Sequence, residues 1–125
     1  MTSPEFGLGA IGQISVTVHD VDRAAAFYRD VLGLAFLFRY PGMAFFDCAG
    51  VRLYLTSHAG DAMHTSILYY RVDDIGDAVG QLEARGVVFD QGPRLAHRAA
   101  RHELWLAFFR DSEGNTLALM SEVPL

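Results

Sequence analysis

The feature that most constrains the fold is an internal repeat. The pattern of residues 18–36, VHDVDRAAAFYRDVLGLAF, returns as residues 72–89, VDDIGDAVGQLEARGVVF, so that Asp20 corresponds to Asp74, 54 residues later. Each copy contains a strand end, a helix N-cap, an amphipathic helix, a glycine stop and the start of the next strand. Repetition of such a pattern at a fixed offset indicates two copies of one structural module.

Length and composition restrict the class of protein. A chain of 125 residues suits a single domain with one hydrophobic core. No apolar run approaches the roughly 20 residues of a membrane span, so we expect no membrane partner. The net charge of −5 argues against a nucleic-acid partner, which would require a broad basic face. All ten basic residues are arginine, which excludes a lysine base or Schiff base.

The N-terminus and the cysteine content bear on localisation. Residues 1–10 contain neither the basic nor the apolar segment of a secretory signal. Cys48 is the only cysteine, so an internal disulfide is impossible, which suits a reducing compartment. We therefore predict a cytoplasmic protein.

Hydrophobic periodicity divides the chain into elements of the two modules. In the first module we expect strands at 11–18, 34–40, 43–48 and 51–56 and a helix at 21–32. In the second we expect strands at 65–72, 87–90, 102–110 and 116–122, a helix beginning at residue 75, and an arginine-rich loop at 91–101. The sequence thus predicts one domain, 1–125, with module one at about 11–56, a linker at 57–64 and module two at about 65–123. The order βαβββ twice predicts an α+β fold.

Three motifs carry a resemblance to a known family. They are VxDxxR at residues 18–23, FYxxxLGL at residues 27–34 and FRDxEGNxLxL at residues 109–119. The chain resembles the vicinal oxygen chelate (VOC) superfamily, the group of glyoxalases, bleomycin resistance proteins and extradiol dioxygenases. The resemblance implies that two βαβββ modules form a cupped mixed sheet around a central cavity, and that two chains pair as a homodimer.

The family resemblance also locates the positions that bind a metal ion in metal-dependent members. Carried over to this chain, these positions are Gln13, Tyr54, Ile67 and Ala118. Divalent ions of the zinc, nickel, iron or manganese kind require several imidazole or carboxylate ligands together. Isoleucine and alanine have no donor atom, so we predict no metal and no other cofactor. A divalent metal at a displaced site is the alternative.

Strand alternation anchored on those four positions predicts the side chains that face the cavity. The predicted ligand-binding residues are Gln13, Ser15, Arg52, Tyr54, Ile67, Tyr69, His102, Leu104, Leu106, Phe108, Ala118 and Met120. These side chains are largely aromatic and aliphatic, as in many sites for small organic molecules. They are also compatible with an ordinary packed interior.

The histidines and arginines of residues 94–102 allow two interpretations. Arg94, His97, Arg98 and Arg101 could form a cationic lid that attracts a carboxylate or phosphate ligand, with His102 as a general acid or base. They could equally form a solvated loop. A relocated metal site built from His102 with His97 or His64 is a third possibility.

Two functions therefore follow from the sequence. The first is a metal-free protein that holds a hydrophobic or aromatic small molecule in the central cavity and resembles the bleomycin resistance branch. Such a protein could act in resistance by sequestration. The second is a metal-dependent lyase or isomerase of the glyoxalase or epimerase kind, or a dioxygenase, with a displaced metal. The sequence leaves open which of them is correct, whether the chain is an enzyme, which ligand it binds and how two chains would pair.

Overall fold

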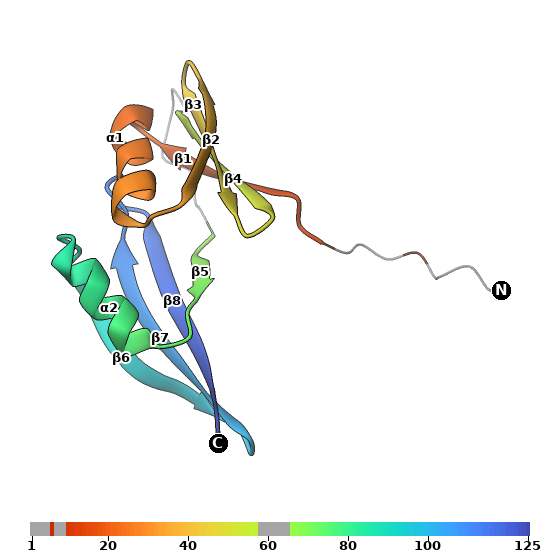
Figure 1. The fold of residues 1–125 in the computed structure, drawn as a ribbon, viewed down its shortest axis with the longest axis vertical. Helices are drawn as coiled ribbons and strands as arrows, with labels where there is room; N and C mark the ends of the chain where they lie inside the picture. Colours follow the sequence, from red (N-terminus) through yellow and green to blue (C-terminus); the bar gives the residue numbers. More distant parts are fainter. Residues whose placement is uncertain (1–5, 7–9, 58–65) are drawn as a thin grey trace.

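The computed structural model describes residue 6, residues 10–57 and residues 66–125 (Figure 1). The first module contains β1 (Gln13–Val18), α1 (Val21–Ala26), η1 (Phe27–Val31), β2 (Ala35–Tyr40), β3 (Met43–Cys48) and β4 (Val51–Ser57). The second contains β5 (Leu68–Arg71), α2 (Ile75–Ala84), β6 (Phe89–Arg98), β7 (His102–Arg110) and β8 (Thr116–Pro124). The α+β class and the two βαβββ modules are confirmed. The expected linker lies outside the described residues, except that Ser57 belongs to β4.

Each module forms its own four-stranded mixed sheet. The first sheet has the strand order β1-β4-β3-β2, and the second has the order β5-β8-β7-β6. In both, the first strand of the module runs parallel to the last, and the remaining pairs are antiparallel. The two sheets therefore repeat one topology, as the sequence repeat predicts.

The predicted caps begin both helices. The Asp20 carboxylate accepts a hydrogen bond from the Arg23 N–H at 3.0 Å, and the Asp74 carboxylate accepts one from the Asp77 N–H at 2.9 Å. Carboxylate oxygens at the N-cap satisfy backbone donors that have no partner within the helix. None of the helices in the described part of the chain is long and apolar enough to cross a membrane.

The first helix ends differently from the expected single α-helix. After Ala26 the chain widens into the π-helical turn η1, and the Leu32 N–H donates to the Phe27 carbonyl five residues earlier at 3.0 Å. Gly33 then adopts a φ of 75°, the left-handed conformation that glycine tolerates best. The predicted glycine stop is confirmed, although the turn before it is wider than expected.

The core lies between the sheets and the helices. In Figure 1, α1 and α2 lie along the same side of the molecule, and each packs on the sheet of its own module. The helix-facing side of each sheet is largely buried. The largest fully buried apolar side chains of the core are Tyr28, Phe46, Phe109, Leu53, Leu55, Leu117 and Val18. The opposite side of each sheet, which we call its inner face, is much more exposed.

The predicted arginine-rich loop at residues 91–101 is wrong, because most of it belongs to β6. This edge strand pairs with β7 through three irregularities in register, at Phe89/Gln91, Gln91/Arg94 and Leu95/His97. The irregularities break the two-residue alternation that identifies a strand in sequence. Pro93 is tolerated because an edge strand leaves backbone N–H groups unpaired.

Candidate ligand-binding site

The inner face of the first sheet carries a row of aromatic rings. In register across the sheet, Ser15 of β1 lies beside Tyr54 of β4, Tyr54 beside Phe45 of β3, and Phe45 beside Phe38 of β2. Neighbouring residues in register point to the same side of a sheet, so these side chains share one face. We call Tyr54, Phe45, Phe38 and the nearby Tyr40 the aromatic ladder.

The rings of the aromatic ladder are stacked across the strands. Tyr54 and Phe45 have ring centroids 4.9 Å apart and planes only 9° apart. Phe45 and Phe38 are 4.6 Å and 26° apart, and Tyr40 meets both edge-on. Phe38 and Tyr40 are 40% and 55% exposed. Aromatic side chains of this size usually bury most of their area, so the ladder is an apolar surface open to a ligand or to another chain.

The inner face of the second sheet is apolar but arranged differently. Tyr69 and Phe108 meet edge-on over Ala118, with ring centroids 6.2 Å apart, and Ala118 is fully buried. Met120 and Leu106 form the next row of the sheet. The centre of this face is therefore aromatic and aliphatic.

The predicted ligand-binding residues fall into two groups, one on each sheet. Gln13, Ser15, Arg52 and Tyr54 belong to the first sheet, and Ile67, Tyr69, His102, Leu104, Leu106, Phe108, Ala118 and Met120 belong to or directly precede strands of the second. Gln13, Ser15, Arg52, Ile67 and Tyr69 are exposed, Ala118 is buried, and the others are half-buried. The strand pairings bring each group together on its own sheet and do not join the two sheets.

Three members of the aromatic ladder were missed by the sequence reasoning. Phe38, Tyr40 and Phe45 are absent from the predicted ligand-binding residues, although all three lie in strands that the sequence predicts. Alternation along β3 places Met43, Phe45 and Asp47 on one face, and this signal could have found Phe45. Phe38 could not be found in this way, because the register shifts between Phe36 and Phe38.

The four positions at which relatives bind metal do not fit an ion in this chain. Gln13 and Tyr54 lie on the first sheet, and the Tyr54 ring is stacked on Phe45. Ile67 and Ala118 lie at the second sheet and have no donor atom. In addition, no three His, Cys, Asp or Glu side chains gather in a metal-binding group within residues 10–57 and 66–125.

The histidine and arginine cluster is divided between the two faces of the second sheet. In register, Arg94 lies opposite Leu106 and His97 opposite Leu104, on the inner face. Arg98 lies on the helix side, where its Nε donates to the Glu103 carboxylate at 2.8 Å. Arg98 is therefore not a member of the predicted cationic lid, because it faces the helix side and binds Glu103.

Two further groups of this cluster have identifiable surroundings. The Arg98 hydrogen bond, together with one from the Trp105 indole, lowers the pKa of the Glu103 carboxyl. His102 is half-buried, and its Nε2 lies 3.9 Å from the Glu122 carboxylate. His64, the other candidate for a relocated metal site, lies outside the described residues.

The family motifs meet at the junction of the two modules. The Tyr28 hydroxyl, at the centre of the first module, donates to Oδ2 of Asp111 at 2.7 Å. The buried Asp111 carboxylate also accepts from the Asn115 and Glu113 N–H groups at 2.8 Å and from the Asn115 side-chain amide at 2.9 Å. Burial and the neighbouring Asp111 charge raise the pKa of Tyr28 well above its usual value, so the hydroxyl remains a donor.

A second contact at the same junction involves Glu113. Its carboxylate, with a side chain only 1% exposed, accepts from the His19 N–H at 2.7 Å, the Asp20 N–H at 2.9 Å and the Arg23 Nε at 2.7 Å. Burial by itself would raise the pKa of Glu113, but these hydrogen bonds outweigh it and hold the pKa below its usual value. We call the Tyr28–Asp111 and Glu113–Arg23 contacts the inter-module clasp. They indicate that these motifs hold the two modules together.

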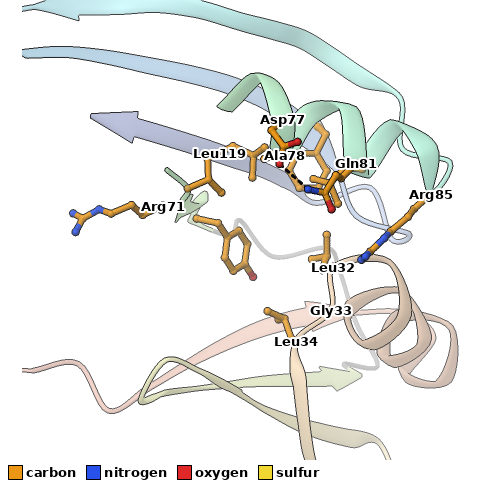
Figure 2. A pocket seen from close by; sticks show the side chains of 13 residues that line it. Leu32, Gly33, Leu34, Arg71, Asp77, Ala78, Gln81, Arg85 and Leu119 are labelled. Atoms are coloured by element: carbon orange, nitrogen blue, oxygen red, sulfur yellow. Dashed lines mark hydrogen bonds between the residues drawn. The ribbon is translucent and has the colours of Figure 1, made fainter. Parts of the chain in front are cut away.

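A pocket of about 490 Å³ lies between the modules on the helix side (Figure 2). Leu32, Gly33 and Leu34 line it from the first module, and Gln81 of α2 and Arg85, directly after α2, line it from the second. Arg85 bridges the modules by donating from Nη1 to the Val31 carbonyl at 2.9 Å. None of the predicted ligand-binding residues lines this pocket.

Comparison with known proteins defines the class. The fold of this chain is one βαβββ module repeated once, with a four-stranded mixed sheet in each copy. The sequence model of the Glyoxalase/Bleomycin resistance protein/Dioxygenase superfamily matches residues 10–119. The chain belongs to this superfamily, as the motifs predict.

Several solved structures share the fold. Lactoylglutathione lyase from Agrobacterium tumefaciens has a TM-score of 0.75 and 24% identity, covering 91% of this chain and 94% of that one. The antibiotic binding protein TnmS3 from Streptomyces sp. CB03234 has a TM-score of 0.74 and 25% identity, covering 94% and 98%. An integron cassette protein from the mobile metagenome of Halifax Harbour sewage outfall has a TM-score of 0.77 and 18% identity, covering 91% and 99%. No curated protein sequence matches the chain.

Proposed function

We propose that this protein is a metal-free binding protein that holds a hydrophobic or aromatic small molecule against the inner faces of its sheets. The observation that carries the proposal is the aromatic ladder. Its stacked rings occupy the face on which metal-dependent relatives place ion ligands, and Phe38 and Tyr40 remain substantially exposed. The relatives include both a lyase and an antibiotic binding protein by name, so the fold by itself is compatible with either function.

We further propose that the binding form is a homodimer. Ile67 and Tyr69 on the second sheet are 40% and 47% exposed, in addition to the exposed ladder on the first. Apolar surface of this kind on a soluble protein commonly marks an interface or a ligand site. A second copy of the chain that covers the inner faces would remove this surface from water and enclose a ligand between the sheets.

A thermal-unfolding titration tests the binding proposal. The purified protein is titrated with a panel of aromatic and alicyclic carboxylates and, separately, with nickel, zinc and manganese ions. A ligand at 100 times its Kd should stabilise the native state by about 2.7 kcal/mol and raise the unfolding midpoint. We expect stabilisation by members of the organic panel and none by the metals.

Two controls separate this proposal from the alternatives. Metal analysis of protein purified without chelators that finds a stoichiometric ion, together with a metal-dependent rise in midpoint, would favour the lyase, isomerase or dioxygenase alternative. Sedimentation equilibrium tests the dimer. If the protein is still a monomer when the ligand concentration is well above its Kd, one chain binds the ligand without a partner.

A further inference from the structure

The stack in the aromatic ladder ends one strand before the edge of the first sheet. Its centroid spacings of 4.9 Å and 4.6 Å match the separation of about 4.8 Å between neighbouring strands, so each strand contributes one ring. The next position in the row belongs to β1, where the residue in register with Tyr54 is Ser15. A serine side chain is too small to fill the space that a ring would occupy.

The open face of the Tyr54 ring is therefore turned toward the space above Ser15. Among the aromatic pairs of the described residues, Tyr54 pairs with Phe45, which covers its other face. Ser15 itself is exposed. A planar ring standing over Ser15 would extend the stack at the same spacing and gain the offset or parallel contact that aromatic pairs favour.

Polar side chains lie on both sides of this space. Gln13 and Thr17 lie two residues before and after Ser15, on the same face of β1 and about 6.6 Å away along the strand. A glutamine amide and a threonine hydroxyl can each donate and accept hydrogen bonds. They would lie at the edges of a ring that stands between them, so the edge groups of the ligand would determine how well it fits.

We propose that the space bounded by Ser15 and Tyr54 is a stacking slot for a planar aromatic compound that carries hydrogen-bonding groups on its edge. The inference rests on the proposed function and specifies its ligand class. The slot selects planar over puckered ring systems, because only a flat ring can fill a gap one strand wide beside Tyr54. The second sheet has no equivalent slot, because Tyr69 and Phe108 cover Ala118.

The test compares two compounds that share a skeleton and a charge. The planar probe is 6-hydroxynaphthalene-2-carboxylate, and the puckered probe is its fully saturated decahydronaphthalene counterpart. Binding of each is measured by calorimetry to the wild type and to Ser15→Leu, Ser15→Ala and Tyr54→Leu variants whose unfolding midpoints establish that they fold. Ser15→Leu fills the slot, and Ser15→Ala leaves it open. Phe38→Leu is the matched control at the other end of the stack.

We expect the wild type to bind the planar probe at least about tenfold more tightly than the puckered one, with perturbed naphthalene absorption on stacking. Ser15→Leu and Tyr54→Leu should each lose about tenfold in affinity for the planar probe, and Ser15→Ala and Phe38→Leu should lose much less. Equal binding of both probes, unchanged by Ser15→Leu, would overturn the slot and leave the proposed function intact. Binding of neither probe, with no response to the wider organic panel, would overturn both.

Discussion

The inter-module clasp gives the most direct test of how the two modules are held together. Tyr28→Phe removes one hydroxyl from a fully buried ring and changes nothing else in shape. The Asp111 carboxylate still accepts hydrogen bonds from its three other donors, so this buried acceptor is not left without partners. A buried hydrogen bond to a charged acceptor contributes roughly 1.5–3 kcal/mol, and the remaining donors favour the lower part of this range. We therefore expect a loss of about 2 kcal/mol.

Urea unfolding measures this loss. For a slope of about 2 kcal/mol per molar urea, the midpoint should fall by about 1 M with the slope unchanged. Tyr40→Phe is the matched control, because Tyr40 is 55% exposed and its hydroxyl should contribute little. If Tyr28→Phe and Tyr40→Phe shift the midpoint equally, the Tyr28–Asp111 hydrogen bond does not stabilise the junction and the role assigned to the family motifs is wrong.

Three further predictions concern pH, a turn and ligand charge. The folded-state pKa of Glu113 lies below its usual value, so its stabilising effect is present above the unfolded-state pKa of about 4.3 and is lost as the pH falls through the lowered pKa. The difference in free energy of unfolding between the wild type and Glu113→Gln, measured by urea unfolding, should therefore shrink below about pH 5, and a difference that grew would contradict this reasoning. Ala49 has a φ of 50°, a left-handed conformation that costs most non-glycine residues about 1–2 kcal/mol and that asparagine tolerates better. Ala49→Asn should therefore raise the melting temperature by about 2–6 °C in calorimetry, and a decrease would count against strain at this turn. Arg94→Ala should weaken binding of aromatic carboxylates several-fold and spare their neutral amides in calorimetric titration, whereas an equal loss for both would exclude a charge role for Arg94.

The fold could be predicted because its two modules each carry the same local signals. The expected strand at 102–110 coincides with β7, and Asp20 and Asp74 cap their helices as predicted. These elements depend on short-range periodicity and capping chemistry, which one sequence contains. The strand expected at 87–90 contains only the start of β6, because register irregularities interrupt the alternation in the rest of it.

The site was less predictable than the fold, for a reason that concerns distance along the chain. The ladder unites rings from three strands, and their stacking depends on a register that includes the irregularity between Phe36 and Phe38. The clasp joins Tyr28 to Asp111, 83 residues later. Periodicity specifies the face of a strand on which a side chain lies, but it does not specify the residue opposite. The motifs signalled the family and gave no indication that they contact one another.

The division of each sheet into a buried and an open face separates two kinds of evolutionary constraint. The helix side holds the packed core and the clasp, where substitutions reduce the free energy of unfolding. The inner face is less buried within one chain, so substitutions at its exposed and half-buried positions should reduce the free energy of unfolding less than substitutions in the core. A library that randomises Ser15, Tyr54 and Phe45 should therefore remain largely folded while it explores new ligands, and the same freedom would let one scaffold diversify its ligands rapidly under selection.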